Sequence, residues 1–184
     1  MKIIITGATG FIGSAVLKKA LDHPSITNVV AYTRRPLQPH VKLENIIQPD
    51  LDLPEDASPC IWCAGAKLGV SLEDAKTMEE AAIKAATKHS RFVYLSGMLA
   101  VKDQSKSLWF ASDARKLKGE TENKLSGQEQ YIARPSMVTQ DWAFPMTIRV
   151  DDLADVLLDL AINGNARKTL ENADLVAHAK SIQE

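Results

Sequence analysis

Short apolar runs alternate with stretches of helical periodicity along most of this chain. The runs that predict strands lie at residues 3–5, 28–32, 45–48, 59–64, 91–95 and 129–133. The helical patterns lie at residues 14–21, 71–89, 112–125 and 151–162. The first run, Ile3-Ile4-Ile5, is apolar and β-branched throughout, as a strand buried on both faces requires. Strands that alternate with helices predict βα units and a parallel sheet.

Capping residues mark several helix ends. Ser71 stands before a long Ala-rich helix and is a favoured N-cap. For the last strong helix we expect Asp151 or Asp152 as N-cap and Gly164 just past the end. The apolar residues of that helix share one stripe: Leu153, Val156, Leu157, Leu160 and Ala161. Residues 171–177 fit either a strand or a terminal helix, so both states stay open.

Composition bounds the class of protein. The chain has 184 residues, of which 45% are hydrophobic, and this is enough for one substantial core. We therefore expect a single domain, residues 1–184. The net charge of −1 gives no reason to expect nucleic acid or an anionic membrane as a partner. No apolar run approaches the roughly 18 residues of a membrane span, and the start of the chain has no signal-peptide pattern. We expect a cytoplasmic protein.

The two cysteines, Cys60 and Cys63, are spaced as C-x-x-C. Without a second cysteine pair or suitably spaced histidines, a metal site is not expected. Both lie in a predicted central strand, which favours two buried thiols over a redox pair. Free thiols suit a reducing compartment.

A glycine-rich turn joins the first strand to the first helix. Gly7, Gly10 and Gly13 follow the apolar run, and a helical pattern begins at Ser14. In this context the first glycine permits a tight turn, the second lets the backbone approach a pyrophosphate, and the third lets helix and strand pack closely. The helix N-terminus adds unpaired N–H groups and a positive dipole end. The turn therefore predicts a dinucleotide site, although it specifies no reaction.

The end of the second strand indicates which dinucleotide is bound. An NAD site usually places an acidic residue there for the ribose 2′-hydroxyl, whereas an arginine accommodates the 2′-phosphate of NADP. This chain has Thr33, Arg34 and Arg35 at that point and no acid. Because a guanidinium pairs bidentately with phosphate oxygens, the sequence predicts NADP(H). The alternative is a solvated pair of surface arginines.

Several motifs resemble one known family. Residues 6–13, Thr-Gly-Ala-Thr-Gly-Phe-Ile-Gly, resemble the T-G-A-T-G-F-I-G opening of extended and atypical short-chain dehydrogenases/reductases. Residues 118–122 resemble the K-G-E-x-E motif of the NmrA-like and Tat-interacting-protein-like members, and residues 150–154 resemble the family's V-D-D-V/L-A helix start. The resemblance implies an α/β, Rossmann-like fold with a doubly wound parallel sheet and a minimal C-terminal substrate region.

The resemblance also implies cofactor contacts beyond the glycines. Asp50 and Leu51 match the pair that flanks adenine, and Ala64 and Gly65 match the place where backbone approaches the ribose next to nicotinamide. Small residues make sense there, since a larger side chain would collide with the ligand. The expected contacts are Gly7, Thr9, Gly10, Phe11, Ile12, Gly13, Thr33, Arg34, Arg35, Asp50, Leu51, Ala64, Gly65, Ser96 and Lys118.

The catalytic machinery that the resemblance implies is incomplete. Short-chain dehydrogenases use a serine, a tyrosine and a lysine, the last two spaced as Y-x-x-x-K. Ser96 matches the serine and Lys118 the lysine, but Ala114 stands where the tyrosine belongs. Counting back from Lys116 instead gives Ser112. Without the phenol, proton delivery loses a contribution of about 10²–10⁴-fold. The candidate replacement donors are Asp113, Lys116, Lys118 and, more weakly, Ser112. Tyr94 should share a face with Ser96, and we expect it in the core.

Apolar side chains follow the strand ends where ligands bind in open α/β sheets. This set predicts a pocket wall for a hydrophobic small molecule, with core packing or a homodimer contact as the alternatives. Its members are Met98, Leu99, Trp109, Phe110, Met137, Trp142, Phe144 and Met146.

Three functions remain open at this point. The first is an NADP(H)-binding oxidoreductase for a hydrophobic small molecule, with hydride transfer assisted by Ser96 and Lys118. The second is a non-redox isomerase, cyclase or lyase on the same fold. The third is an NmrA-like nucleotide-sensing protein that works through partner contacts. The missing tyrosine raises the second and third almost to the level of the first.

Overall fold

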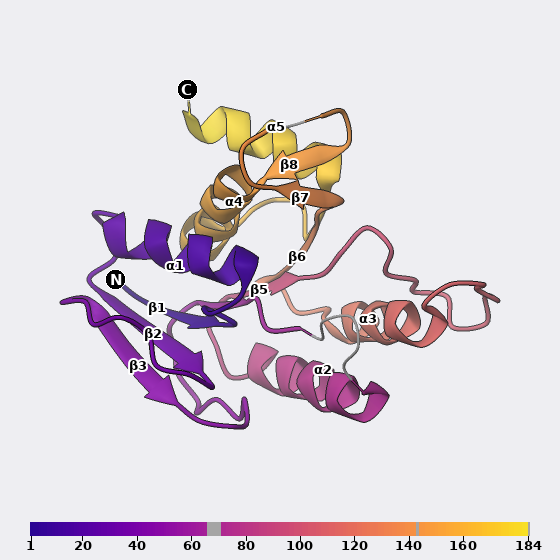
Figure 1. Ribbon diagram of the computed structural model, residues 1–184, viewed down its shortest axis with the longest axis horizontal. Coiled ribbons are helices and arrows are strands. Elements are labelled where there is room, and N and C mark those ends of the chain that lie inside the picture. Colours follow the sequence, from indigo (N-terminus) through magenta and orange to yellow (C-terminus); the bar gives the residue numbers. More distant parts are fainter. Residues whose placement is uncertain (66–70, 143, 184) are drawn as a thin grey trace.

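Parallel strands form the centre of the protein, with helices on both faces (Figure 1). The computed structural model describes residues 1–65, 71–142 and 144–183. The main sheet contains β1 (Lys2–Thr6), β2 (Asn28–Thr33), β3 (Leu43–Ile47), β4 (Cys60–Trp62), β5 (Phe92–Leu95), β6 (Gln130–Arg134) and β9 (Thr169–Glu171). The helices are α1 (Phe11–Asp22), α2 (Leu72–Ala86), α3 (Ser112–Lys124), α4 (Val150–Asn163) and α5 (Asn172–Gln183). The expected α/β, Rossmann-like fold is confirmed.

The strand order is β3-β2-β1-β4-β5-β6-β9, and every neighbouring pair is parallel. The chain therefore starts in the middle of the sheet, runs outward through β2 and β3, and then crosses to the other side of β1 at β4. The direction of winding reverses between β1 and β4. In open α/β sheets this switch point, at the carboxyl ends of the strands, is where ligands bind.

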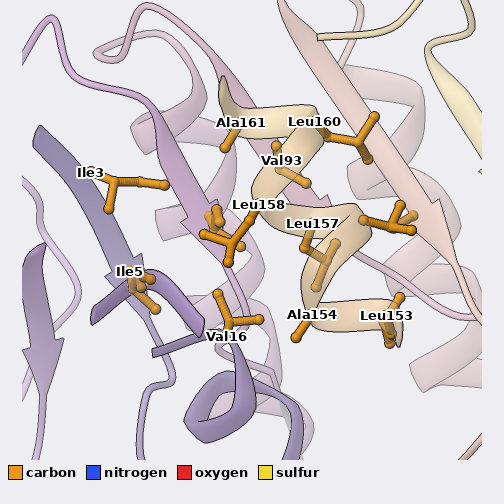
Figure 2. Packing of buried hydrophobic residues seen from close by; sticks show 14 of the residues in the cluster. Ile3, Ile5, Val16, Val93, Leu153, Ala154, Leu157, Leu158, Leu160 and Ala161 are labelled. Atoms are coloured by element: carbon orange, nitrogen blue, oxygen red, sulfur yellow. The ribbon is translucent and has the colours of Figure 1, made fainter. Parts of the chain in front are cut away.

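The alternation of side chains along β1 divides the core into two layers. Ile3 and Ile5 belong to the larger cluster, under α1, α4 and α5, whereas Ile4 belongs to the smaller one. In the larger cluster Ile3, Ile5 and Val16 lie close to the apolar face of α4 (Figure 2). All three isoleucines are at most 1% exposed, as a strand covered on both faces requires.

The smaller layer lies between the sheet and helices α2 and α3. Trp62, Phe92 and Tyr94 fill it with buried aromatic rings, and alanines of α2 pack against them. Helix α3 contributes little apolar surface, because its buried residues are Gly119, Thr121 and Glu122. Polar contacts of α3 with β5 and the residue after it therefore take a large part in this layer, and they belong to the candidate site described below.

The predicted elements are confirmed with shifted boundaries. Helix α1 begins at Phe11, three residues before the helical pattern was expected to start, because the glycine turn runs directly into it. Ser71 caps α2 as predicted, with its hydroxyl accepting from the Asp74 N–H at 3.0 Å. At the C-terminus the open choice resolves into the short strand β9 followed by helix α5.

Two expectations about the C-terminal third were wrong or incomplete. Arg149, and neither Asp151 nor Asp152, is the N-cap residue of α4, since both aspartates already lie in the first helical turn. Their charges still suit the positive end of the helix. The sequence also gave no sign of β7 (Met137–Thr139) and β8 (Thr147–Arg149), which form a separate parallel pair. These strands are too short to show a pattern.

In the described part of the chain, no helix is both long and apolar enough to cross a membrane.

Candidate functional site

The glycine turn after β1 is packed too tightly for side chains at two of its positions. Gly7 has φ +70°, and a Cβ there would lie 2.6 Å from the Ala64 nitrogen. A Cβ on Gly13 would lie 2.1 Å from the Gly7 carbonyl oxygen. Gly10 closes the turn by donating its N–H to that same oxygen at 2.9 Å. The turn therefore packs closely against the end of β4. We call it the bare glycine turn, because no side chain at Gly7, Gly10 or Gly13 covers its backbone.

Helix α1 presents an unneutralised N-terminus at this turn. Its N-cap residue Gly10 has no side chain to accept from the first N–H groups, and its first turn has no acidic residue. Within the residues that the structure describes, the N–H groups of residues 11–13 have no hydrogen-bond partner. A helix start in this state offers donors and a positive dipole end to an anion. The turn and the helix start thus fit the pyrophosphate of a dinucleotide.

The loop after β2 carries the two arginines next to the turn, because Tyr32 of β2 lies beside Thr6 of β1. Arg34 and Arg35 are exposed, and neither makes an ion pair with the parts of the chain that are described. Thr33 is buried and donates its hydroxyl to the Arg35 carbonyl at 2.7 Å. Its hydrogen is therefore already used, so Thr33 shapes this loop.

Asn45 of β3 holds the same loop from the other side. Its amide donates to the Ala31 carbonyl at 3.0 Å and to the Thr33 hydroxyl at 2.7 Å. Its side-chain oxygen accepts from the Leu37 N–H at 2.9 Å. Asn45 fixes the course of the chain on both sides of the arginines, a role that the sequence analysis did not assign to it.

The ends of β3 and β4 continue the same edge of the sheet. Asp50 is exposed, and Leu51 packs against the smaller core cluster together with Ala64. Ala64 is fixed to the glycine turn, because its N–H donates to the Thr6 hydroxyl at 3.3 Å. Gly65 is exposed, and a Cβ there would lie 3.8 Å from the Lys118 ammonium nitrogen. The edge of the sheet that starts at the glycine turn thus extends to the neighbourhood of Lys118.

Lys118 of α3 lies in a cluster with Tyr94 of β5 and Glu79 of α2. Its ammonium donates to the Tyr94 hydroxyl at 3.2 Å and to Glu79 Oε1 at 3.4 Å, and it lies 5.0 Å from the centre of the Tyr94 ring. The Tyr94 hydroxyl donates to the other oxygen of Glu79. Lys118 keeps 28% of its side-chain surface exposed, whereas the Glu79 side chain keeps only 4%. The lysine therefore forms the accessible end of a buried cluster.

Tyr94 is a core residue, as expected, and is poorly suited to act as an acid. Its side chain is fully buried, and burial together with the neighbouring Glu79 charge raises its pKa well above the ordinary value. Burial disfavours the phenolate, and a nearby carboxylate disfavours it further. Tyr94 therefore stays protonated and holds Glu79 and Lys118 in place.

Ser96 follows β5 and joins a second buried cluster. Its hydroxyl donates to Glu122 Oε1 at 2.5 Å, and Arg134 Nε donates to the same oxygen at 2.9 Å. Lys102 lies 3.7 Å from the other Glu122 oxygen. The Ser96 hydrogen therefore points to Glu122 in this arrangement. For Ser96 to polarise a substrate carbonyl, as expected from the sequence, the hydroxyl must rotate away from Glu122.

A cavity of about 140 Å³ lies between α2, α3 and the loop after β5. Ala114 and Lys118, one helical turn apart on α3, both line it. Asp113 is exposed on the first turn of α3 and does not line the cavity, and neither does Lys116. Of the expected replacement donors, the structure brings only Lys118 to the cavity.

Close packing at Gly119 fixes the distance between the loop after β5 and helix α3, and with it the position of Lys118. A Cβ at this position would lie 1.9 Å from the Val101 carbonyl oxygen. The Val101 N–H also donates to the Arg115 carbonyl at 2.9 Å. The loop after β5 therefore rests directly on the α3 backbone, which a helix with an ordinary side chain here would prevent.

The apolar residues that the sequence predicted as a substrate wall lie at the surface. Trp109 is 96% exposed and Met146 is 72% exposed, and the other six residues are between 46% and 63% exposed. The rings of Trp142 and Phe144 pack edge to face, with their centres 4.6 Å apart. Of the whole set only Leu99 lines the cavity. The exposure excludes core packing, and a ligand wall and a dimer contact stay as predictions.

Both cysteines are free thiols. Burial raises the pKa of the Cys63 thiol to about 12, and it also raises the pKa of Cys60 well above its ordinary value. Both are therefore protonated at neutral pH, and a thiol in this state is a poor nucleophile.

Sequence reasoning missed the acids that hold the site together. Glu79 lies on the buried face of α2 with Ala75, Ala82 and Ala86. A glutamate in line with an alanine stripe at helical spacing was the available signal. Glu122 belongs to the K-G-E-x-E motif, but no pattern in the highly charged α3 distinguishes it from the other charged residues there.

The fold and the site define an NAD(P)-binding protein of the Rossmann type with an oxidoreductase-like architecture. A sequence model described as the NAD-dependent epimerase/dehydratase family matches residues 3–108, and the chain belongs to this family. The resemblance to short-chain dehydrogenases/reductases agrees with this. The matched segment includes the glycine turn and Ser96 but ends before Lys118. No curated protein sequence matches this chain.

Solved structures are similar in fold. The oxidoreductase ylbE from Lactococcus lactis is 18% identical, with 100% of this chain and 97% of that chain covered and a TM-score of 0.73. A putative NAD-dependent epimerase/dehydratase from Bacillus halodurans is 16% identical, with 92% and 91% covered and a TM-score of 0.70. Gre2 from Candida albicans, solved with NADPH, is 15% identical, with 93% and 77% covered and a TM-score of 0.67. At these identities the likeness concerns the fold alone.

Proposed function

We propose that the protein binds NADP(H) along the carboxyl edge of its sheet and acts as an oxidoreductase on a hydrophobic small molecule. One observation carries the proposal. The bare glycine turn, the Ala64–Gly65 segment and the Lys118 ammonium follow one another along this edge. Ala64 bonds to Thr6 next to the turn, and a Cβ on Gly65 would lie 3.8 Å from the Lys118 nitrogen. A dinucleotide lying on that line has its pyrophosphate at α1 and its nicotinamide end near Lys118.

The preference for NADP(H) rests on Arg34 and Arg35. Both are exposed beside the turn, and the described residues offer them no carboxylate partner. A 2′-phosphate would supply the missing counter-charge, and a guanidinium binds it with paired hydrogen bonds. Asn45 and Thr33 support this by fixing the loop. The solved structure of Gre2 with NADPH shows that a protein of this fold takes that cofactor.

The chemistry at the far end depends on Lys118. A bound nicotinamide supplies or accepts a hydride. The Lys118 ammonium has three N–H donors, of which Tyr94 and Glu79 take two,. The remaining donor can hold a ribose hydroxyl or direct a proton toward a substrate oxygen. Ser96, which directly follows β5 and comes two residues after Tyr94, adds a hydroxyl if it turns from Glu122.

Nicotinamide absorbance provides the test of this reaction. Purified protein with NADPH is offered a panel of apolar aldehydes and ketones, and the rate of NADPH oxidation is compared between wild type and Lys118→Met. We expect turnover in wild type and a loss of about 10²-fold or more in the variant. Lys116→Met, which changes a lysine off the cavity, is the control and should retain activity. A variant as active as wild type would remove Lys118 from the proposal.

A non-redox reaction on the same fold is the second candidate, and the state of the hydroxyl groups favours it. Ala114 offers no phenol, Tyr94 is buried and committed to Glu79, and the Ser96 hydrogen points to Glu122. An isomerase or lyase would need the shaped cavity and Lys118 but no net transfer of hydride. Product formation without any change in nicotinamide absorbance would favour this candidate over the first.

A further inference from the structure

The cavity between α2 and α3 has an apolar wall and one polar end. The apolar lining consists of Ala75, Leu99, Ala100, Ala114 and Leu117, together with Gly97. The polar end is formed by Glu79 and Lys118, and Arg115 is the third charged residue of the lining. Such a lining, mostly apolar with a few convergent polar groups, is typical of small-molecule sites.

The volume of the cavity sets the size of the group that it can surround. At about 140 Å³ it is close to the roughly 150 Å³ of an apolar protein cavity that binds benzene. A single six-membered ring therefore fits inside it, whereas a fused ring system would extend out through its open side. Small residues at 75, 100 and 114 leave this room, because each ends at Cβ.

The charges at the polar end select the functional group. Glu79 and Lys118 already neutralise each other at 3.4 Å, so an ionised ligand would bring an unpaired charge into a largely apolar space. A carboxylate would also face the Glu79 charge. The third charged residue of the lining, Arg115, keeps its charge, but it directs Nε and Nη1 to the Leu99 and Phe110 carbonyls at 2.9 and 3.4 Å. Among the described residues it makes no hydrogen bond with Glu79 or Lys118, so a neutral group is favoured at the Glu79–Lys118 end of the cavity.

A hydroxyl is the neutral group that satisfies both partners. It can accept the remaining Lys118 N–H, and it can donate to Glu79 Oε1, which accepts from Lys118 and has a second lone pair,. Tyr94 holds the other oxygen of Glu79 in place with its hydroxyl. An ether or ketone would use only the lysine, and an amine would compete with it for the carboxylate.

We propose that this cavity binds a single apolar ring carrying one hydroxyl, a phenol or cyclic alcohol, with its oxygen at Lys118 and Glu79. As a statement about the substrate it rests on the proposed function, since Lys118 also borders Gly65 in the proposed cofactor site. As a binding site it rests on the cavity alone.

Phenol itself is the probe, with toluene and benzoate as matched comparisons. Toluene replaces the hydroxyl by a methyl group, and benzoate carries a charge. Binding to the full chain is followed by backbone amide chemical shifts, with and without NADPH. We expect phenol to shift the amides of residues 97–100 and 114–118 and to bind about tenfold or more tightly than toluene, because its hydroxyl bonds two charged groups. Benzoate should bind less tightly than phenol.

Ala114→Phe tests the location, because its ring would occupy the space proposed for the ligand. It should weaken phenol binding about tenfold or more while the protein stays folded, since Ala114 is an exposed helical residue. Ala173→Phe makes the same change at an exposed position of α5 and should leave phenol binding unchanged. Glu79→Gln should narrow the preference for phenol over toluene.

The outcomes separate this inference from the proposed function. Equal binding of phenol and toluene, shifts outside the cavity, or unchanged binding to Ala114→Phe would each overturn the inference. If NADPH binds normally in the same samples, the proposed function survives that result. If phenol binds as expected and NADPH does not bind, the cavity site stands and the cofactor proposal fails.

Discussion

The Tyr94 hydroxyl should be far more important for stability than its small size implies. In Tyr94→Phe the ring and its packing remain, and only the oxygen that bridges Lys118 and Glu79 is lost. Both bonds involve charged partners, and such bonds contribute about 1.5–3 kcal/mol each. Because Glu79 keeps Lys118 as a partner at 3.4 Å, part of this is retained. We expect a loss of about 2–3 kcal/mol in the free energy of unfolding.

The protein contains a matched control for this substitution. Tyr131 also bridges a lysine and a glutamate, accepting from Lys168 at 3.1 Å and donating to Glu129 at 3.2 Å. There, however, both partners are exposed, at 45% and 46% of their side-chain surface. Water can replace the lost bonds, and exposed ion pairs contribute little. Tyr131→Phe should therefore cost only a small fraction of what Tyr94→Phe costs.

Urea denaturation followed by circular dichroism measures both variants against wild type. An unchanged slope with a lower midpoint for Tyr94→Phe would show that stability alone changed. In a thermal scan the expected loss corresponds to about 5–10 °C. Equal losses for the two variants, or no loss for Tyr94→Phe, would refute the reasoning that burial makes the Glu79–Tyr94–Lys118 cluster strong.

Three further predictions concern the cofactor loop, the packing of α3 and acid stability. Arg34→Ala should reduce the preference for NADPH over NADH about tenfold or more, measured by titration with each cofactor, whereas Arg149→Ala, another exposed arginine, should leave it unchanged. Gly119→Ala should lower the free energy of unfolding by about 2–3 kcal/mol, because its Cβ would overlap the Val101 carbonyl,; Gly97→Ala, where a Cβ meets no atom within 4 Å, should be nearly neutral. Burial works against ionisation of Asp56, but hydrogen bonds from Lys2 and Ser58 outweigh it and lower its pKa from 3.8 to about 2. Its contribution to stability is thus present above pH 3.8 and lost as the pH falls through about 2, and Asp56→Asn should flatten that part of a stability–pH curve.

The sequence predicted the parts of the fold that repeat a strong pattern. Ile3 to Ile5 sit in the middle of the sheet because three β-branched residues in a row fit only a strand covered on both faces,. The glycine turn was predictable for a similar reason, since Gly7 and Gly13 leave no room for side chains. Strands β7 and β8 were missed because three residues carry no period.

The part of the site around Ser96 and Lys118 was much less predictable. Ser96 and Lys118 could be assigned from the sequence to the end of a strand and to a helix. Their hydrogen-bond partners are buried glutamates, which the hydrophobic pattern does not reveal. Glu79 reaches Lys118 from α2, thirty-nine residues earlier. Glu122 takes the Ser96 hydrogen from one turn further along α3. Such pairings depend on which helices pack together, and this is a property of the whole fold.

For the exposed aromatic residues the sequence shows the character of the side chains but not what they contact. Their apolar character was plain in the sequence, but the expectation that they enclose a pocket could not be derived from it. In the structure Trp109 and Phe110 lie before α3, and Trp142 and Phe144 lie between β7 and β8, all largely in solvent. Hydrophobicity predicts that a side chain avoids water, and it does not predict which molecule covers it.

Titration of the purified protein with NADPH and with NADH tests the central claim most directly. The claim is that the bare glycine turn, the two arginines and Lys118 form one NADP(H) site along the carboxyl edge of the sheet. We predict that NADPH binds with a single site per chain and about tenfold or more tightly than NADH. We also predict that Lys118→Met weakens the binding. Failure of both cofactors to bind, or equal affinity for the two, would contradict the account.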